Sequence, residues 1–198
     1  MSDRAPSTRA RGRSYGAFLR AFFRDRKTIG AVAPTSRGVS RRIARLAAVE
    51  SAQRVAEFGP GTGAITHELL AALPAEARLW GFEIHPPFVR HLREAIDDPR
   101  LAVLDDSAEA IGELRGREAP DGFDAIVSSI PFSLIGPEQT PAILRAAHDA
   151  LRPGGRFVAL QYHPRFLPPF LRAEFGRVER EVYLWNIPPA TLLSARRD

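Results

Sequence analysis

A glycine-rich turn follows an apolar strand in the stretch Val55-Ala-Glu-Phe-Gly-Pro-Gly-Thr-Gly63. A helix is expected to begin directly after it, near Ala64. Glycines in such a turn let backbone N–H groups approach a ligand closely, and the amino end of a helix favours negative charge at the same place. The stretch therefore predicts a nucleotide-cofactor cradle between a strand and a helix.

Apolar runs alternate with helical patterns along the rest of the chain. Strands are expected at 54–58, 78–83, 101–105, 123–128 and 156–161, and helices at 36–48, 64–73, 87–95, 107–114 and 141–151. This alternation is typical of a parallel α/β sheet with helices on both faces. Two further strands, at 178–186 and 191–195, are joined by a short Pro-containing link, which predicts an antiparallel hairpin.

The glycine pattern alone fits two kinds of cofactor. Gly59, Gly61 and Ala64 satisfy the dinucleotide fingerprint, with Glu83 as a ribose ligand at the end of the next strand. The order Glu57-x-Gly59-x-Gly61-x-Gly63 resembles the first motif of the Rossmann-like, class I S-adenosylmethionine-dependent methyltransferases. That resemblance, together with the closing hairpin, implies S-adenosylmethionine as the cofactor.

Residues at the carboxyl ends of the strands are the candidates for cofactor binding, because ligands bind there in an open parallel sheet. Glu83 has two acceptors for the ribose hydroxyls, and Ile84 can cover an adenine face. By resemblance, Asp106 accepts from the adenine amino group, with the Ser107 backbone beside it. The complete expected set is Ser36, Glu57, Gly59, Pro60, Gly61, Gly63, Glu83, Ile84, Asp106, Ser107 and Ser128.

The composition limits the possible chemistry. The chain has no cysteine, which excludes disulfides, thiolate nucleophiles and cysteine-bound zinc, and we expect no metal in the site. No apolar run reaches the ~20 residues of a membrane span, and the N-terminus lacks the apolar core of a signal peptide. We therefore expect a cytoplasmic monomer with one full core.

Positive charge is concentrated near the N-terminus. Residues 1–27 contain eight of the 28 basic and two of the 23 acidic residues, which leaves 20 basic and 21 acidic residues elsewhere. Such a segment favours a polyanion, either an anionic membrane surface or nucleic acid, and a solvated tail is the alternative. We divide the chain into a basic N-terminal part, residues 1–35, and a cofactor-binding domain, residues 36–198.

Apolar side chains recur with helical spacing in the N-terminal part, at Tyr15, Phe18, Leu19 and Phe22. A short basic helix of this kind can lie in a membrane interface, with reversible association at the inner face of the cytoplasmic membrane. It can equally pack on the domain as a lid. The lid would bring Tyr15 to the cofactor and the substrate.

The motif Ser129-Ile-Pro-Phe132 stands where amine methyltransferases carry Asn-x-Pro-Tyr or a similar motif. Ser replaces Asn, which favours a compact alkyl amine over a planar adenine amine. With Gly30-Ala-Val-Ala-Pro-Thr-Ser36 and Trp185-Asn-Ile-Pro-Pro-Ala190, the chain resembles the bacterial phospholipid N-methyltransferases, which methylate phosphatidylethanolamine toward phosphatidylcholine. It also resembles the ribosomal RNA adenine dimethyltransferases, whose additional C-terminal helical domain is not expected here.

This resemblance implies a phospholipid substrate rather than nucleic acid, with RNA or another amine as the alternative. Ser129 and Pro131 would shape the acceptor site, and Phe132 would pack against the amine. Tyr162 would bind the amine or the methylated cation, and His163 would hold phosphate or relay a proton. In the segment 163–172, Arg165 and Arg172 would meet the lipid phosphate while Phe166, Leu167 and Phe170 touch acyl chains. A Pro-rich loop packed on the core is the alternative.

Overall fold

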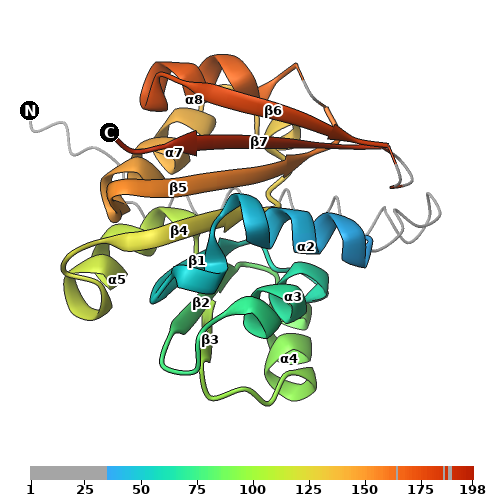
Figure 1. The fold of residues 1–198 in the computed structure, drawn as a ribbon, viewed down its shortest axis with the longest axis vertical. Helices are drawn as coiled ribbons and strands as arrows, with labels where there is room; N and C mark the ends of the chain where they lie inside the picture. The colour runs from blue at the N-terminus through green and yellow to red at the C-terminus, as the bar shows by residue number, and fades with distance from the viewer. Residues whose placement is uncertain (1–34, 164, 185, 187–188) are drawn as a thin grey trace, which may run out of the picture. The chain divides into compact units, whose positions relative to one another are not determined.

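The computed structural model describes residues 35–163, 165–184, 186 and 189–198, which form a seven-stranded sheet with helices on both faces (Figure 1). The strands are β1 (Arg54–Phe58), β2 (Arg78–Glu83), β3 (Leu101–Asp105), β4 (Phe123–Ser128), β5 (Leu151–Gln161), β6 (Val178–Tyr183) and β7 (Ala190–Arg196). The predicted N-terminal helix, with Tyr15, lies outside the described residues, so the domain boundary at residue 35 stays a prediction.

The strand order is β3-β2-β1-β4-β5-β7-β6. The first five strands pair in parallel, whereas β7 runs antiparallel to both β5 and β6. The predicted mostly parallel sheet with a C-terminal antiparallel hairpin is therefore confirmed. Phe58 of β1 is in register with Phe82 of β2 and Ser128 of β4, so the carboxyl ends of these strands form one edge.

Helices cover both faces of the sheet. They are α2 (Arg37–Leu46), α3 (Ala64–Ala72), α4 (Pro86–Ala95), α5 (Ile111–Glu118), α6 (Phe132–Ile135), α7 (Thr140–Ala150) and α8 (Leu167–Phe175), with 3-10 turns η1 (Val49–Ser51) and η2 (Ala108–Ala110). α2, α3 and α4 lie on one face, and α5, α7 and α8 lie on the other (Figure 1). No helix in the described part of the chain is long and apolar enough to span a membrane.

Alternating strand residues fill a core on each face. Ile43 of α2 and Leu69 of α3 pack with Val55, Leu79 and Val127 of the sheet, and all five are completely buried. Aromatic rings pack on the opposite face, in the pairs Trp80–Phe123 and Phe157–Phe175. β2 and β5 therefore contribute side chains to both layers, as expected for strands covered on both faces.

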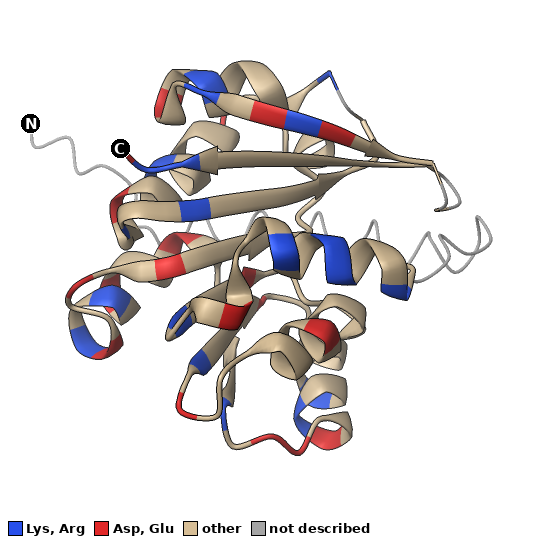
Figure 2. Ribbon diagram, in the orientation of Figure 1, with Lys and Arg blue, Asp and Glu red and all other residues tan. Residues whose placement is uncertain are grey.

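Helix α2 is amphipathic, with Val39, Ile43 and Ala44 buried. Ser36 caps its amino end, because the Ser36 hydroxyl accepts from the Val39 N–H at 3.4 Å. Its arginines lie on the outer side (Figure 2), and Arg42 forms a bidentate pair with Glu181 of the edge strand β6. The helix is thereby tied to the closing hairpin as well as to the core.

β5 begins at Leu151 rather than at the predicted residue 156, and Arg152-Pro-Gly-Gly155 form a bulge within it. Leu151 pairs with Phe123, and pairing resumes with Arg156 opposite Ala125, so the intervening residues loop out of the ladder. Gly155 has no room for a side chain, because a Cβ there would lie 2.8 Å from the Arg152 carbonyl oxygen. Strand β6 ends at Tyr183, whereas the sequence predicts a strand that continues to residue 186.

The Pro-rich segment after β5 contains a helix that was not predicted from the sequence. Pro168 and Pro169 stand in the first turn of α8, where a missing backbone N–H removes no helical hydrogen bond. Leu167 and Leu171 are completely buried beneath this helix. The expectation that Leu167 touches acyl chains is therefore wrong, because its side chain belongs to the core.

Asp124 joins three segments at the amino-terminal edge of the sheet. Its Oδ2 accepts from the Gln53 and Arg54 N–H groups, both at 2.8 Å, and its Oδ1 accepts from Arg152 Nε at 2.6 Å. Burial raises the pKa of Asp124, but Arg152 and the two backbone donors lower it further, so the net pKa lies below its usual value. Such a carboxylate contributes stability above its unfolded-state pKa, and the contribution is lost as the pH falls through the folded-state pKa.

We expect Asp124→Asn to lower the free energy of unfolding by about 1–3 kcal/mol at pH 7, because a charge-assisted network is lost. The deficit should be smaller at pH 3, because below the ordinary pKa of 3.8 the carboxyl takes up a proton in the unfolded chain and the advantage of its lowered pKa in the folded chain is progressively lost. Urea unfolding at both pH values measures it. Asp121→Asn is the control, because the Asp121 side chain is 85% exposed and its ion pair spans 3.9 Å. Equal deficits at pH 3 and pH 7 would show that the charge is irrelevant.

Candidate active site

The glycine turn between β1 and α3 lies at the carboxyl edge of the sheet. Gly59, Gly61 and Gly63 have φ angles of 70°, 58° and 83°, in the region that favours glycine. At Gly63, which precedes α3, a Cβ would lie 3.1 Å from a Leu92 methyl group. The turn therefore keeps backbone atoms exposed to the space above β1, with the amino end of α3 directed at the same place.

Glu83 lies beside this turn at the end of β2 and is 4% exposed. Its Oε2 accepts from the Gly61 N–H at 3.0 Å, and its Oε1 accepts from the His85 N–H at 2.9 Å. Burial raises the pKa of Glu83, while these backbone hydrogen bonds partly oppose the rise. Each carboxylate oxygen retains a lone pair, so the group can accept from two vicinal hydroxyls.

Glu57 is completely buried under the turn. Its Oε2 accepts from the Thr66 hydroxyl at 2.7 Å, while its Oε1 has no hydrogen-bond partner in the described structure. Burial raises the pKa of Glu57 to about 8, Thr66 lowers it, and the neighbouring Glu83 raises it. A buried acid with an unpaired oxygen fits a cationic ligand such as S-adenosylmethionine, since that ligand brings positive charge and donors.

The end of β3 presents a more open group. Asp106 is exposed, and its Oδ1 accepts from the Ser107 N–H at 2.7 Å. Ser107 caps η2 by accepting from the Glu109 N–H. Ile84, which follows Glu83, is half-buried. These residues stand at the ends of adjacent strands, since Glu83 and Asp105 are in register.

The segment after β4 contacts the glycine turn directly. The Ser129 hydroxyl donates to the Gly59 carbonyl at 2.7 Å, and the Ser129 N–H donates to the Phe58 carbonyl at 3.0 Å. Ser128 is completely buried and accepts from the Ile130 N–H. The predicted cofactor turn and the predicted acceptor segment therefore form one structure.

Pro131 and Phe132, which are both predicted to line the acceptor site, stand at the amino end of the short helix α6. Pro131 precedes the helix and is half-buried, whereas Phe132 is completely buried. The Phe132 ring is thus part of the core in this structure and does not line an open surface. For Phe132 to pack against a substrate amine, its ring would have to become accessible.

Gln161, at the end of β5, is a further candidate that was not predicted from the sequence. Its amide Nε2 donates to the Ile130 carbonyl at 2.8 Å and to the Leu160 carbonyl at 2.6 Å, and the residue is 2% exposed. Gln161 therefore fixes the acceptor segment from the neighbouring strand. A polar residue that ends the apolar run Phe157–Leu160 was the available signal.

Tyr162, His163 and Arg165 follow Gln161 at the same edge. Tyr162 is half-buried and packs against the apolar cluster beneath α2 and α3, while His163 and Arg165 are exposed. Asn186 was also missed: it is buried, and its Oδ1 accepts from the Ser36 N–H at 3.1 Å. The two motifs that carry the phospholipid resemblance meet through this hydrogen bond.

Metal ligands and cavities are two further features of the described residues. The residues that the structure describes contain no group of three His, Asp or Glu side chains able to hold a metal ion. A cavity of about 360 Å³ lies at the opposite, amino-terminal edge of β5, between Leu46 and Phe175, and none of the predicted site residues line it.

Comparisons with known proteins agree with this geometry. The model of the methyltransferase domain family matches residues 56–157. The chain is 28% identical to an ornithine lipid N-methyltransferase of Singulisphaera acidiphila, over 87% of this chain and 91% of the relative. It is 34% identical to the ribosomal RNA small subunit methyltransferase A of Acidothermus cellulolyticus, over 62% of this chain but only 40% of that protein.

A solved structure shows the same fold. The O-methyltransferase TomG of Streptomyces achromogenes, in complex with SAM, superposes with a TM-score of 0.68 at 18% identity, over 92% of this chain and 90% of TomG. The sheet, the glycine turn and the family match lead to one conclusion. The chain belongs to the methyltransferase domain family and is a class I methyltransferase that uses S-adenosylmethionine.

Proposed function

We propose that this enzyme methylates the amine of a membrane lipid, with phosphatidylethanolamine as the substrate and phosphatidylcholine as the end product. The observation that carries the proposal is the similarity to a lipid N-methyltransferase over nearly the full length of both chains. The RNA-modifying relative is matched over less than half of its length. Ornithine lipid, which the first relative's name specifies, is the second candidate substrate.

The residues at the strand ends would hold the cofactor. Glu83 would accept from the ribose hydroxyls, Asp106 and the Ser107 backbone would contact the adenine edge, and Ile84 would cover its face. Glu57 and the glycine turn would surround the methionine part. S-adenosylmethionine supplies an electrophilic methyl group, so the protein's main task is to place a neutral amine in line with it.

The acceptor segment would supply the oxygens that orient the amine. Hydrogen bonds hold this segment in place: the Ser129 hydroxyl donates to the Gly59 carbonyl, and the Ile130 carbonyl accepts from Gln161 Nε2 and from the Phe132 N–H. Tyr162 would pack against the methylated cation. His163 is exposed and can carry the ammonium proton to solvent.

Gln161→Leu should lower kcat about tenfold, because the segment after β4 loses the side-chain hydrogen bond that holds it to β5. Its dissociation constant for S-adenosylhomocysteine should stay within about twofold, since Gln161 does not touch the glycine turn through any hydrogen bond described here. Single-turnover methyl transfer and calorimetry measure the two quantities. Gln53→Leu, at an exposed position on the opposite edge, is the control. A parallel loss of cofactor affinity would argue against a positioning role.

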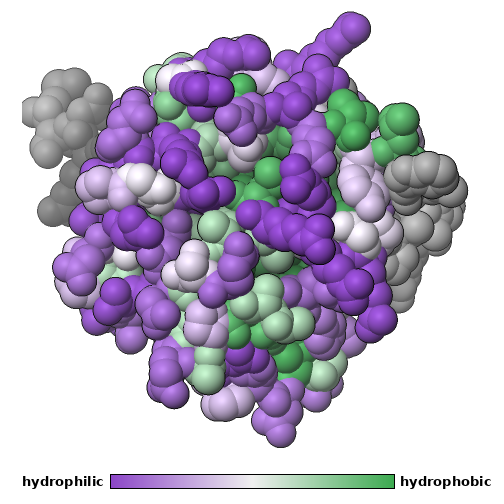
Figure 3. Space-filling view, in the orientation of Figure 1, coloured by the Kyte–Doolittle hydropathy of each residue, from purple (hydrophilic) through white to green (hydrophobic). Residues whose placement is uncertain are grey.

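Several surface features support a lipid substrate. Arg165 is exposed shortly after the carboxyl end of β5, Arg172 is exposed in the last turn of α8, and the rings of Phe166 and Phe170 pack together at 5.2 Å while staying half-buried. At the end of β6, Leu184 is 71% exposed. Mostly hydrophilic residues cover the face in Figure 3, with apolar patches between them. The basic N-terminal part would add reversible attraction to anionic membranes.

Transfer of labelled methyl groups from S-adenosylmethionine by the full chain tests the proposal. The acceptors are vesicles with phosphatidylethanolamine plus anionic lipid, vesicles with ornithine lipid, and ribosomal RNA. We expect label in phosphatidylethanolamine, with less at high salt, because screening weakens attraction to the anionic surface. Label in ornithine lipid alone would change the head group but keep the lipid class. Label in RNA alone would contradict the proposal.

A further inference from the structure

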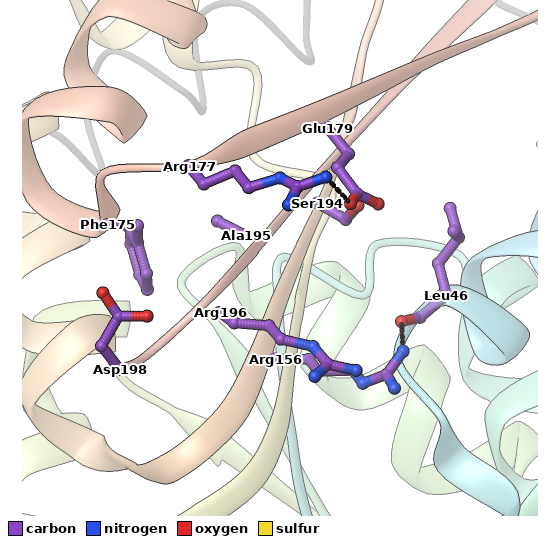
Figure 4. Close-up of a pocket in the computed structure, with 9 residues that line it drawn as sticks. All are labelled: Leu46, Arg156, Phe175, Arg177, Glu179, Ser194, Ala195, Arg196 and Asp198. Atoms are coloured by element: carbon purple, nitrogen blue, oxygen red, sulfur yellow. Dashed lines mark hydrogen bonds and ion pairs between the residues drawn. The ribbon is translucent and has the colours of Figure 1, made fainter.

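The cavity at the amino-terminal edge of β5 lies far from the cofactor edge. Arg156 and Gln161 are five residues apart along β5, about 17 Å in an extended strand. The volume of about 360 Å³ is in the range of small-molecule sites. The lining residues are shown in Figure 4 and include three arginines, Arg156, Arg177 and Arg196.

Two of these arginines occupy an unfavourable arrangement. Arg156 of β5 and Arg196 of β7 are register partners on adjacent antiparallel strands, so their side chains leave the same face of the sheet directly opposite each other. Figure 4 shows the two guanidinium groups extending toward the carboxyl end of α2 at Leu46. Like charges in directly opposed positions destabilise a sheet unless something neutralises them.

The described residues supply little neutralisation. Arg156 Nη1 donates to the Leu46 carbonyl at 3.0 Å, which engages one of its donors. Within the described part of the chain, neither Arg156 nor Arg196 has a carboxylate within 4.0 Å, because Glu179 pairs with Arg177 instead, at 3.4 Å. Burial lowers the pKa of Arg156, and the charge of Arg196 lowers it further, while the more distant Glu50 and Glu179 act in the opposite direction.

We propose that this cavity is a second binding site, distinct from the active site, for a ligand that carries a phosphoryl group. Arg156 and Arg196 would each donate to the phosphoryl oxygens, as guanidinium groups commonly do. Ser194, two residues before Arg196 on β7, lines the same cavity and adds a hydroxyl donor. Phe175 and Ala195 add apolar lining from the opposite face of the sheet, because Ala195 pairs with Phe157, which stacks on Phe175. The acidic residues Glu179 and Asp198 also line the cavity.

Binding of two probes to the full chain tests the proposal at matched ionic strength. One probe is glycerol 3-phosphate, measured by calorimetry, and the other is vesicles of phosphatidylglycerol, measured by flotation. The test variant is Arg196→Gln, because Arg196 is exposed and its replacement should preserve the fold. The control is Arg117→Gln, which removes the same charge from an exposed position on α5 outside the cavity.

We expect saturable binding of glycerol 3-phosphate, with a dissociation constant about tenfold higher in Arg196→Gln and unchanged in Arg117→Gln. If only vesicle binding weakens, and only in Arg196→Gln, the phosphoryl group belongs to a lipid head group. Absence of both effects, or equal losses in the two variants, would overturn the proposal. Binding of S-adenosylhomocysteine should be unaffected in both variants, which separates this result from any failure at the active site.

Discussion

Glu83→Gln should raise the dissociation constant for S-adenosylhomocysteine about 30- to 100-fold. The carboxylate is held by the Gly61 and His85 N–H groups, and its remaining lone pairs face the position proposed for the ribose. Glutamine removes the negative charge and turns one acceptor into a donor, so charge-assisted hydrogen bonds of about 1.5–3 kcal/mol each are lost. Calorimetric titration measures the change.

Glu76→Gln is the matched control for this experiment. Glu76 is exposed in the turn before β2, at the opposite edge of the sheet, and its replacement removes the same charge. Its cofactor affinity should equal that of the wild type. Wild-type affinity in Glu83→Gln as well, with an unchanged unfolding midpoint, would refute the ribose assignment.

The second large effect concerns stability and Glu57. The folded-state pKa of about 8 exceeds the ordinary value of 4.5, so the folded chain binds more protons than the unfolded chain between these pH values. Stability must therefore fall as the pH rises from 4.5 to 8. A glutamine side chain cannot ionise. Above pH 8 the free energy of unfolding of Glu57→Gln should therefore exceed that of the wild type by on the order of 2–4 kcal/mol.

Thermal unfolding without ligand, at pH 5 and pH 8.5, measures this difference. At pH 5 the two proteins should have similar midpoints, because Glu57 is then protonated and neutral. With S-adenosylhomocysteine present, the order should reverse, because the variant binds the ligand less tightly. Parallel pH profiles for the two ligand-free proteins would show that Glu57 is not the buried acid that limits stability. A stability cost of this kind is common where a residue serves binding.

The first four strands were predictable because they are short, mostly apolar runs, and β1, β2 and β4 are largely buried. β1 to β4 begin and end at the predicted residues, and the carboxyl ends that hold Glu57 and Glu83 follow directly from those bounds. The bulge in β5 and the helix α8 were not predicted. Pro and Gly are typical of turns and irregular stretches, although Pro is equally compatible with the first turn of a helix.

The hydrogen bonds that join the parts of the site could not be predicted from local sequence patterns. The Ser129–Gly59 hydrogen bond links residues 70 positions apart, and the Ser36–Asn186 bond links residues 150 apart. Such pairs depend on which strands become neighbours and on their register. The burial of Phe132 follows from the same cause, since α6 turns its first residue into the core.

The most direct test of the central claim is mass spectrometry of lipids from a bacterium that makes phosphatidylethanolamine but no phosphatidylcholine and expresses the full chain. We predict masses for mono-, di- and trimethylated phosphatidylethanolamine, which should be absent when the Glu83→Gln variant is expressed at the same level. Unmethylated lipids would contradict the assignment to phosphatidylethanolamine if the protein purified from the same cells is folded and binds S-adenosylhomocysteine.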